Sequence, residues 1–273
     1  MDSLLRKNKG ITLIELLVAL VITGILVGAI YRTFISQQKT YTVQEEVVDM
    51  QQSVRANISR MMREIRMTGF GNVSMVLPVT TGGKTFNNVV NLDTPVAGAL
   101  TIVSATGSAT LTDIPAANQV TVNSLTDAHG NTLFDLGDRK YVSIGGLESY
   151  IITNIAGTTL TLNGNLTFAH TINITQVFAI RAISYQVSGV TLLRDENNGQ
   201  SLADRSLADN IEALQFAYFK DDGITQTANP PEIRNIQVTL RARTNDSDPA
   251  YKNDGGYRKR TIASNVRLRN MGL

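Results

Sequence analysis

The chain has 273 residues, of which 42% are hydrophobic, and its formal net charge is only +2. A charge so near zero creates no overall field that would favour nucleic acid as a partner. Because cysteine is absent, disulfides, thiolate metal sites and cysteine nucleophiles are excluded. The length suffices for a long helix and one or two globular units.

The N-terminal segment is the most informative part of the sequence. A nearly continuous apolar run extends from Ile11 to Tyr31, behind a short leader that carries Arg6, Lys7 and Lys9. As a helix that rises about 1.5 Å per residue, this run spans roughly 31 Å, close to the thickness of a bilayer core. The basic leader favours a cytoplasmic N-terminus. We therefore expect residues 11–31 to cross a membrane once, with the rest of the chain exported.

One carboxylate, Glu15, lies inside the apolar run. A carboxylate in the middle of a bilayer costs about 2.5–3.5 kcal/mol and usually marks a function. A permanent anchor, a secretory signal peptide and a prepilin segment are the three interpretations. Val27-Gly28-Ala29 would satisfy the small-residue rule for signal cleavage after Ala29, but a charge at Glu15 and the length of the run are poorly suited to a signal peptide.

The stretch K-G-I-T-L-I-E, from Lys9 to Glu15, resembles the type IV prepilin cleavage motif. The resemblance implies that a prepilin peptidase cleaves after Gly10 and that Ile11 becomes the N-methylated N-terminus. It also implies that Glu15 docks the subunit by neutralising the N-terminal amine of a neighbouring subunit. Ile11 departs from the Phe that most often stands at the first mature position in that family.

The helical pattern continues beyond the apolar run. Neither Pro nor Gly interrupts residues 29–68 after Gly28. Apolar residues recur at spacings of three and four, which is typical of one buried helix face; they are Val43, Val47, Met50, Val54, Ile58, Met61 and Ile65. The sequence therefore predicts one helix over residues 11–68, with a membrane half and an amphipathic half that packs on a sheet.

The region from residue 69 to residue 172 has a different character. Ser, Thr, Asn and Gly are frequent, and short apolar alternations are separated by turn-forming residues, as in all-β structure. We expect an inserted β-rich region, a small barrel or sandwich, with residues 78–92 as an exposed loop.

The last hundred residues alternate more regularly, as in Leu214, Phe216 and Tyr218. Ser188-Gly189 indicates a two-residue hairpin. These patterns predict that residues 173–273 form a C-terminal antiparallel sheet of four or more strands, with one face on the amphipathic half of the helix. The expected fold class is α+β.

Three further segments, residues 49–70, residues 207–218 and residues 236–240 together with 264–270, resemble PilW-like and PulJ-like minor pilins. The resemblance implies a PilW-like minor pilin that helps to start assembly of a type IV pilus and caps its tip, in twitching motility, adhesion or DNA uptake. Its partners would be other minor pilins and the major pilin. Its location would be the bacterial inner membrane, then the pilus at the cell surface. A PulJ-like minor pseudopilin of a type II secretion system and a bitopic envelope adhesin are the alternatives.

No pattern in the sequence favours catalysis, a cofactor or a metal. His129 and His170 lie about forty residues apart without neighbouring acidic or histidine ligands, whereas a metal site needs three or four. The acidic loop at residues 245–256 does not have the spacing of an EF-hand, and a solvated loop is the better interpretation. No nucleophile elbow or phosphate loop is present. We expect a protein that is not an enzyme and that has no cofactor.

Basic residues gather near the C-terminus, at Arg258, Lys259 and Arg260. The sequence allows a contact patch here for an acidic partner subunit, and nucleic acid is the less favoured partner. An exposed face of the final strand is the simpler interpretation.

Overall fold

The computed structural model describes residues 11–71, 79–81, 84–86, 88–94, 96–196, 206–248 and 251–271. Gly10 and the basic leader therefore lie outside the described residues. The chain divides into two compact units, Met1–Asp49 and Met50–Leu273, and one helix runs through both.

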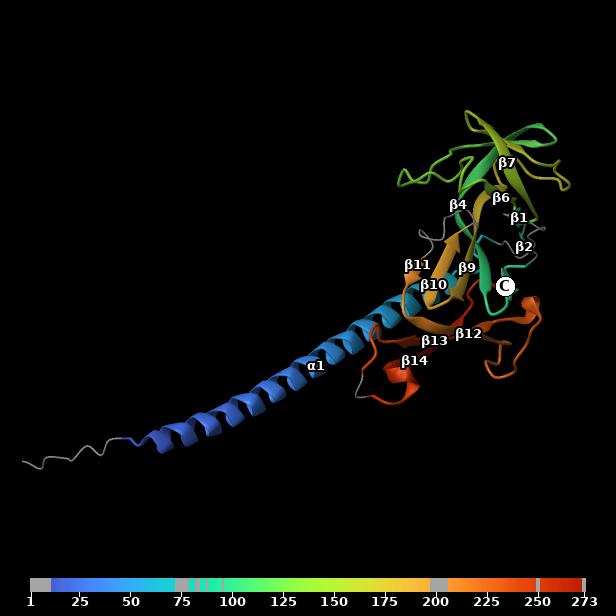
Figure 1. The fold of residues 1–273 in the computed structure, drawn as a ribbon. Helices are drawn as coiled ribbons and strands as arrows, with labels where there is room; N and C mark the ends of the chain where they lie inside the picture. The colour runs from blue at the N-terminus through green and yellow to red at the C-terminus, as the bar shows by residue number, and fades with distance from the viewer. Residues whose placement is uncertain are drawn as a thin grey trace, which may run out of the picture. The chain divides into compact units, whose positions relative to one another are not determined.

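Helix α1 comprises the 54 residues Leu13–Arg66 and is drawn in blue in Figure 1. It carries Glu15 in its first turn and Arg63 and Arg66 in its last, an order that suits the helix dipole. The turn after the helix contains Gly69 with φ of +77°, a backbone conformation that glycine adopts without strain. The prediction of one long helix is confirmed, with each end two residues inside the expected range.

Most strands belong to one antiparallel sheet of nine strands, in the order β11-β10-β9-β6-β7-β8-β5-β4-β3. The strands are β3 Val90–Leu92, β4 Leu100–Ala116, β5 Gln119–Val122, β6 Tyr141–Ile144, β7 Glu148–Ala156, β8 Thr159–Leu162, β9 Gln176–Ser188, β10 Thr191–Glu196 and β11 Ser206–Ala208. A separate two-stranded sheet contains β1 Val79–Thr81 and β2 Lys84–Phe86. Three further strands, β12 Ile211–Phe219, β13 Asn235–Arg243 and β14 Lys259–Arg267, make a sheet of their own.

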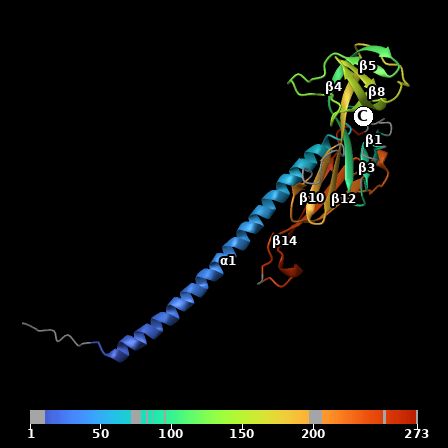
Figure 2. The same cartoon turned by 45° about the horizontal axis from the view of Figure 1, so that its top comes forward.

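Part of the nine-stranded sheet closes on itself. β4 pairs with β5, β5 with β8, β8 with β7, β7 with β6, β6 with β9, and β9 again with β4. These strands therefore form an antiparallel barrel of six strands, which occupies the upper part of Figure 2. Apolar side chains, among them Leu111, Val142, Ile152, Leu160 and Val177, form one core cluster in it, as expected for a small barrel whose interior is filled by side chains.

The long strands β4 and β9 continue beyond the barrel into the rest of the sheet. Their register runs from Leu100↔Tyr185 to Thr110↔Gln176. Beyond the barrel they join β3, β10 and β11, and a second core forms there. This core contains Val54, Ile58, Met61 and Ile65 of α1 together with apolar residues of β3, β4, β9 and β10 and of β12, β13 and β14. The C-terminal part of the amphipathic half thus packs on β-structure, as its spacing predicted. Val43 and Val47, which were expected on the same buried face, are only partly buried and lie outside this core.

Two details differ from the sequence-based expectations. Residues 173–273 do not form a single sheet, because β9 and β10 belong to the nine-stranded sheet and only β12, β13 and β14 form a separate one. The physical reason is that β9 has 13 residues, enough to pair with barrel strands at one end and with β10 at the other. Residues 78–92, expected as a loop, include β1, β2 and β3, and Val89 and Val90 are buried. The division into leader, inserted region and C-terminal domain stays a prediction.

Candidate functional site

The start of α1 is a capping box built from Thr12 and Glu15. The Thr12 backbone N–H and the Thr12 hydroxyl both donate to Glu15 Oε2, at 2.9 Å each. The Glu15 N–H donates in return to Thr12 Oγ1 at 3.3 Å. Such a reciprocal arrangement satisfies N–H groups that have no partner within the helix. The sequence T-L-I-E therefore fixes where the helix begins.

The capping box gives Glu15 a local structural role beside its predicted docking role. Ile11, directly before the box, is 79% exposed. The structure thus brings Ile11 and Glu15 together at one helix end, while Gly10 lies outside the described residues.

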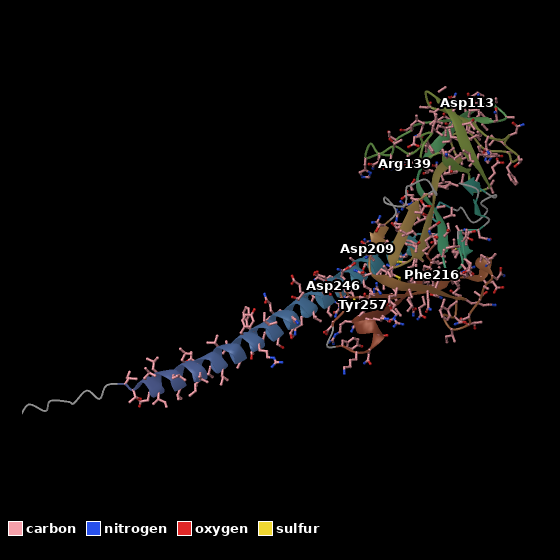
Figure 3. All side chains as sticks on the ribbon, viewed as in Figure 1. Asp113, Arg139, Asp209, Phe216, Asp246 and Tyr257 are labelled. Atoms are coloured by element: carbon pink, nitrogen blue, oxygen red, sulfur yellow. The ribbon has the colours of Figure 1, made fainter. Side chains whose placement is uncertain are left out.

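The apolar half of α1 is not covered by any other part of the chain that the structure describes. No residue from 11 to 49 is buried, and Figure 3 shows side chains projecting from the helix all along this unit. An 18-residue window in α1 has a mean hydropathy of 2.7. By length and composition, therefore, this helix can cross a membrane.

Residues 5–31 match the family model described as the prokaryotic N-terminal methylation motif. The chain carries a prepilin-type N-terminal motif. This motif implies processing by a prepilin peptidase and assembly with other pilins, and it marks structural subunits rather than enzymes. Together with the apolar helix it supports membrane anchoring. No curated protein and no solved structure matches the chain.

The basic residues near the C-terminus have acidic neighbours. Arg258 Nη2 lies 2.9 Å from Asp248 Oδ2, and Lys259 Nζ lies 3.0 Å from Glu212 Oε1. Arg260 is exposed. The charge count along the C-terminal segment did not include Glu212. That residue lies on β12, two strands away from Lys259 on β14 in the same sheet. Two of the three predicted patch residues are thus largely neutralised.

The fold also builds a buried pair that sequence reasoning missed. His170 Nε2 lies 2.5 Å from Glu148 Oε1, and the two side chains are 1% and 0% exposed. Glu148 Oε2 accepts bonds from the Tyr150 hydroxyl at 2.7 Å and from the N–H and hydroxyl of Thr167 at 2.8 and 2.6 Å. Burial alone would raise the pKa of Glu148, but these bonds and His170 lower it to about 2. The pair ties the segment between β8 and β9 to the first residue of β7.

The only sequence signal for this pair was an isolated carboxylate in a region poor in charge. The sequence separation of 22 residues hid the proximity of Glu148 and His170. The β7–β8 hairpin creates this proximity by bringing the chain back to the start of β7.

A second, partly buried cluster fixes the end of α1 on the sheet. Arg194 Nε lies 3.1 Å from Glu64 Oε2, and the Tyr185 hydroxyl donates to the same carboxylate. Arg60 Nε approaches Glu64 Oε1 at 3.5 Å. Although burial opposes it, the bonds from Arg194 and Tyr185 lower the pKa of Glu64. Glu64 is therefore held as a carboxylate between the helix and strands β9 and β10.

Proposed function

We propose that this chain is a PilW-like minor pilin of a type IV pilus. It is held in the bacterial inner membrane by α1, with its N-terminus in the cytoplasm and its β-structure outside. It is then built into the filament, where it helps to start assembly and caps the tip. The observation that carries this proposal is the match of residues 5–31 to the prepilin-type motif, continuous with a 54-residue helix whose first half is uncovered.

Processing precedes assembly in this proposal. The prepilin peptidase cleaves between Gly10 and Ile11, and the new amine of Ile11 is N-methylated. The helix begins at Leu13, so cleavage leaves its first turn and the capping box in place. A continuous helix satisfies its own backbone groups, which allows the same segment to leave lipid for a bundle of helices without unfolding.

Glu15 then docks the subunit. Among the residues that the structure describes, its carboxylate accepts bonds from the backbone N–H and the hydroxyl of Thr12 alone. Those bonds have one ionised member, the carboxylate, whereas a bond from a neighbour's protonated N-terminal amine joins two opposite charges and adds their direct electrostatic attraction. Pairing two charges also makes their burial tolerable and fixes the axial position of one helix against the next. Docking is thus an exchange of partners at Glu15.

The barrel is what favours a pilus subunit over a PulJ-like pseudopilin of a type II secretion system. It adds the strands β5, β6, β7 and β8 and the barrel ends of β4 and β9 to the helix and the sheets, which makes the chain long for a pseudopilin. A bitopic adhesin is the third candidate, and it would retain the leader.

The test replaces Glu15 by Val in the full chain and scores processing and filament incorporation separately. We expect normal cleavage and at least a tenfold fall in the amount of subunit recovered in sheared filaments. Glu45→Val is the matched control, because Glu45 is an exposed carboxylate of the same helix outside the motif. Wild-type incorporation of the Glu15→Val subunit would contradict the docking role, and recovery of the wild-type chain with secretion pseudopilins instead of pilus subunits would favour the alternative.

A further inference from the structure

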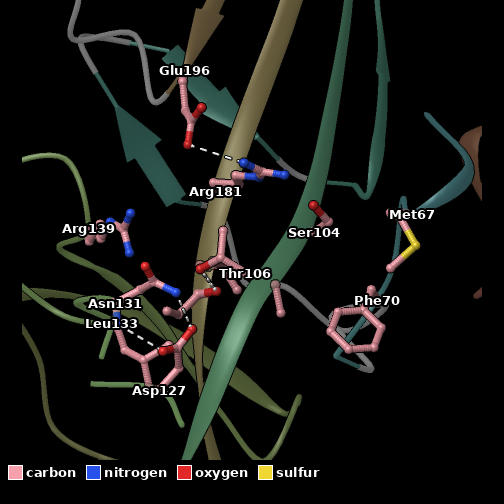
Figure 4. Close-up of a pocket in the computed structure, with 13 residues that line it drawn as sticks. Met67, Phe70, Ser104, Thr106, Asp127, Asn131, Leu133, Arg139, Arg181 and Glu196 are labelled. Carbon is pink, nitrogen blue, oxygen red and sulfur yellow. Dashed lines mark hydrogen bonds and ion pairs between the residues drawn. The ribbon is translucent and has the colours of Figure 1, made fainter. Parts of the chain in front are cut away.

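A groove crosses the junction between the barrel and the rest of the nine-stranded sheet, with a volume of about 350 Å³. Its floor is the pair β4–β9 where Ser104 lies opposite Arg181. In Figure 4, Met67 and Phe70 lie on one side of β4, and Asn131 and Arg139 lie on the other. A groove of this size lies within the range of small-molecule sites, about 300–1,000 Å³.

A bulge and a glycine shape this groove. The register of β4 against β9 shifts between Ala105 and Gly107, and the extra residue, Thr106, is exposed. A Cβ on Gly107 would lie 2.6 Å from Leu133 Cδ2, so a side chain at this position would force the Leu133 side chain to move. Bulges often redirect side chains beside functional sites.

The turn that carries Met67 and Phe70 forms one side of the groove, and backbone hydrogen bonds fix it to the edge of β4. Gly69 N donates to Val103 O at 3.0 Å, and Ala105 N donates to Phe70 O at 2.9 Å. Because the backbone of the turn is held in this way, the side chains of Met67 and Phe70 keep a defined place, and they are 40% and 42% exposed.

The acidic groups of the groove already have partners. Asp127 Oδ1 accepts the N–H groups of His129 and Asn131 at 2.8 Å each, and Oδ2 accepts from Asn131 Nδ2 at 2.8 Å. Glu196 Oε2 lies 2.9 Å from Arg194 Nη2, and Glu196 Oε1 lies 3.5 Å from Arg181 Nη1. The carboxylates are thus engaged within the chain.

The arginine donors are not fully used. Arg181 Nε is buried and has no hydrogen-bond partner among the residues that the structure describes. The guanidinium of Arg139 has one bond there, from Nη1 to Thr132 O, although a guanidinium has five N–H donors. A buried donor without a partner is costly and calls for an explanation. The polar groups of the groove that remain available to a ligand are therefore the N–H donors of positively charged arginines.

We infer that the groove binds a carboxylate carried on an apolar body. The carboxylate occupies the side of Arg181 and Arg139, because a planar guanidinium matches a carboxylate with two parallel bonds. The apolar body covers Met67 and Phe70. The chemistry is the same for a free aromatic acid and for the C-terminal carboxylate of a peptide with an aromatic last residue. This site is separate from the helix start on which assembly depends.

The experiment titrates the detergent-solubilised full chain with 3-phenylpropionate and with the matched neutral probe 3-phenylpropanamide, using isothermal titration calorimetry. A second arm uses the peptide Gly-Gly-Phe as free acid and as amide. We expect each acid to bind at least tenfold more tightly than its amide. Tighter binding of the peptide acid identifies a peptide terminus as the source, and tighter binding of 3-phenylpropionate identifies a free acid; either result supports the inference.

Variants locate the binding in the groove. Arg139→Gln and Arg181→Gln should each weaken binding of the acids at least tenfold, and Phe70→Ala should weaken acid and amide alike by several fold. Arg139 is exposed, so its loss should leave the thermal unfolding midpoint unchanged, and it keeps the test valid if Arg181→Gln fails to fold. The control is Arg260→Gln, an exposed arginine outside the groove. Equal binding of acid and amide, no binding of either acid, or undiminished binding to Arg139→Gln would overturn the inference.

Discussion

The two halves of α1 share one backbone but have opposite surroundings. From residue 11 to residue 49 no side chain is buried, whereas Val54, Met61 and Ile65 are 0% exposed. The second half finds its partners inside its own chain, on the sheets. Residues 11–31 of the first half are nearly all apolar, and none of them is buried by the residues that the structure describes. Periodicity in the sequence therefore predicts that a helix forms. Which groups the helix contacts is known only from the burial of its side chains.

The largest effect expected within this comparison comes from shortening a buried side chain of the second half. Met61→Ala should lower the free energy of unfolding by roughly 2–5 kcal/mol, because it removes apolar contacts and leaves a cavity. Ile25→Ala, in the first half, should leave that free energy unchanged, since Ile25 is 69% exposed. Denaturant unfolding in detergent, followed by the β-sheet signal, measures both. Equal effects of the two substitutions would contradict the contrast between the halves.

The carboxylates of the same helix sharpen the contrast. Glu64→Ala should cost about 3 kcal/mol, because it leaves Arg194 and Tyr185 without their partner; the Glu64 side chain is 15% exposed, which places the cost at the low end for a buried pair. Glu45→Ala removes an exposed carboxylate and should change the free energy of unfolding by less than about 0.5 kcal/mol. A cost for Glu64→Ala as small as for Glu45→Ala would mean that the cluster does not hold the helix on the sheet.

Glu148 extends the comparison to the barrel and predicts a pH dependence. Its pKa is about 2 in the folded chain against an ordinary 4.5, so the folded state prefers the ionised form. The stabilisation is fully present above about pH 4.5 and is lost as the pH falls through 2. Glu148→Gln should therefore flatten the decline of the unfolding midpoint between pH 4.5 and pH 2. His129→Ala, at an exposed histidine, is the control, and an unchanged acid profile in Glu148→Gln would refute the assignment.

The smallest effect belongs to the capping box. Thr12→Ala should destabilise the first turn of α1 by about 1 kcal/mol without changing the free energy of unfolding of residues 50–273. Amide hydrogen exchange at Glu15 and Leu16, whose N–H groups donate to Thr12, should accelerate about fivefold, and exchange in β13 should stay the same. Unchanged exchange in the first turn would show that Thr12 does not cap the helix.

How far the sequence predicts this molecule depends on how local each interaction is. The helix and its buried stripe were predictable, because spacings of three and four between Val54, Ile58, Met61 and Ile65 are visible along the chain. The motif around Glu15 was visible for the same reason. The shared use of β4 and β9 by the barrel and the sheet was not, since pairing partners such as Leu100 and Tyr185 lie far apart in sequence.

The distance in sequence between interacting residues also explains why two ion pairs were not predicted. His170 looked isolated because its partner Glu148 arrives through hairpin pairing, and Lys259 looked unpaired because Glu212 comes from another strand. Interactions within one or two turns of a helix could be predicted from the sequence, whereas interactions between strands were visible only in the structure.

The mature N-terminus shows whether residues 5–31 are a prepilin segment whose helix moves from lipid into a filament. Mass spectrometry of the N-terminal peptide from the assembled protein should find Ile11 first, with one added methyl group on its amine. An N-terminus at Met1, as in a permanent anchor, or at Ile30, as after signal-peptide cleavage, would contradict the account.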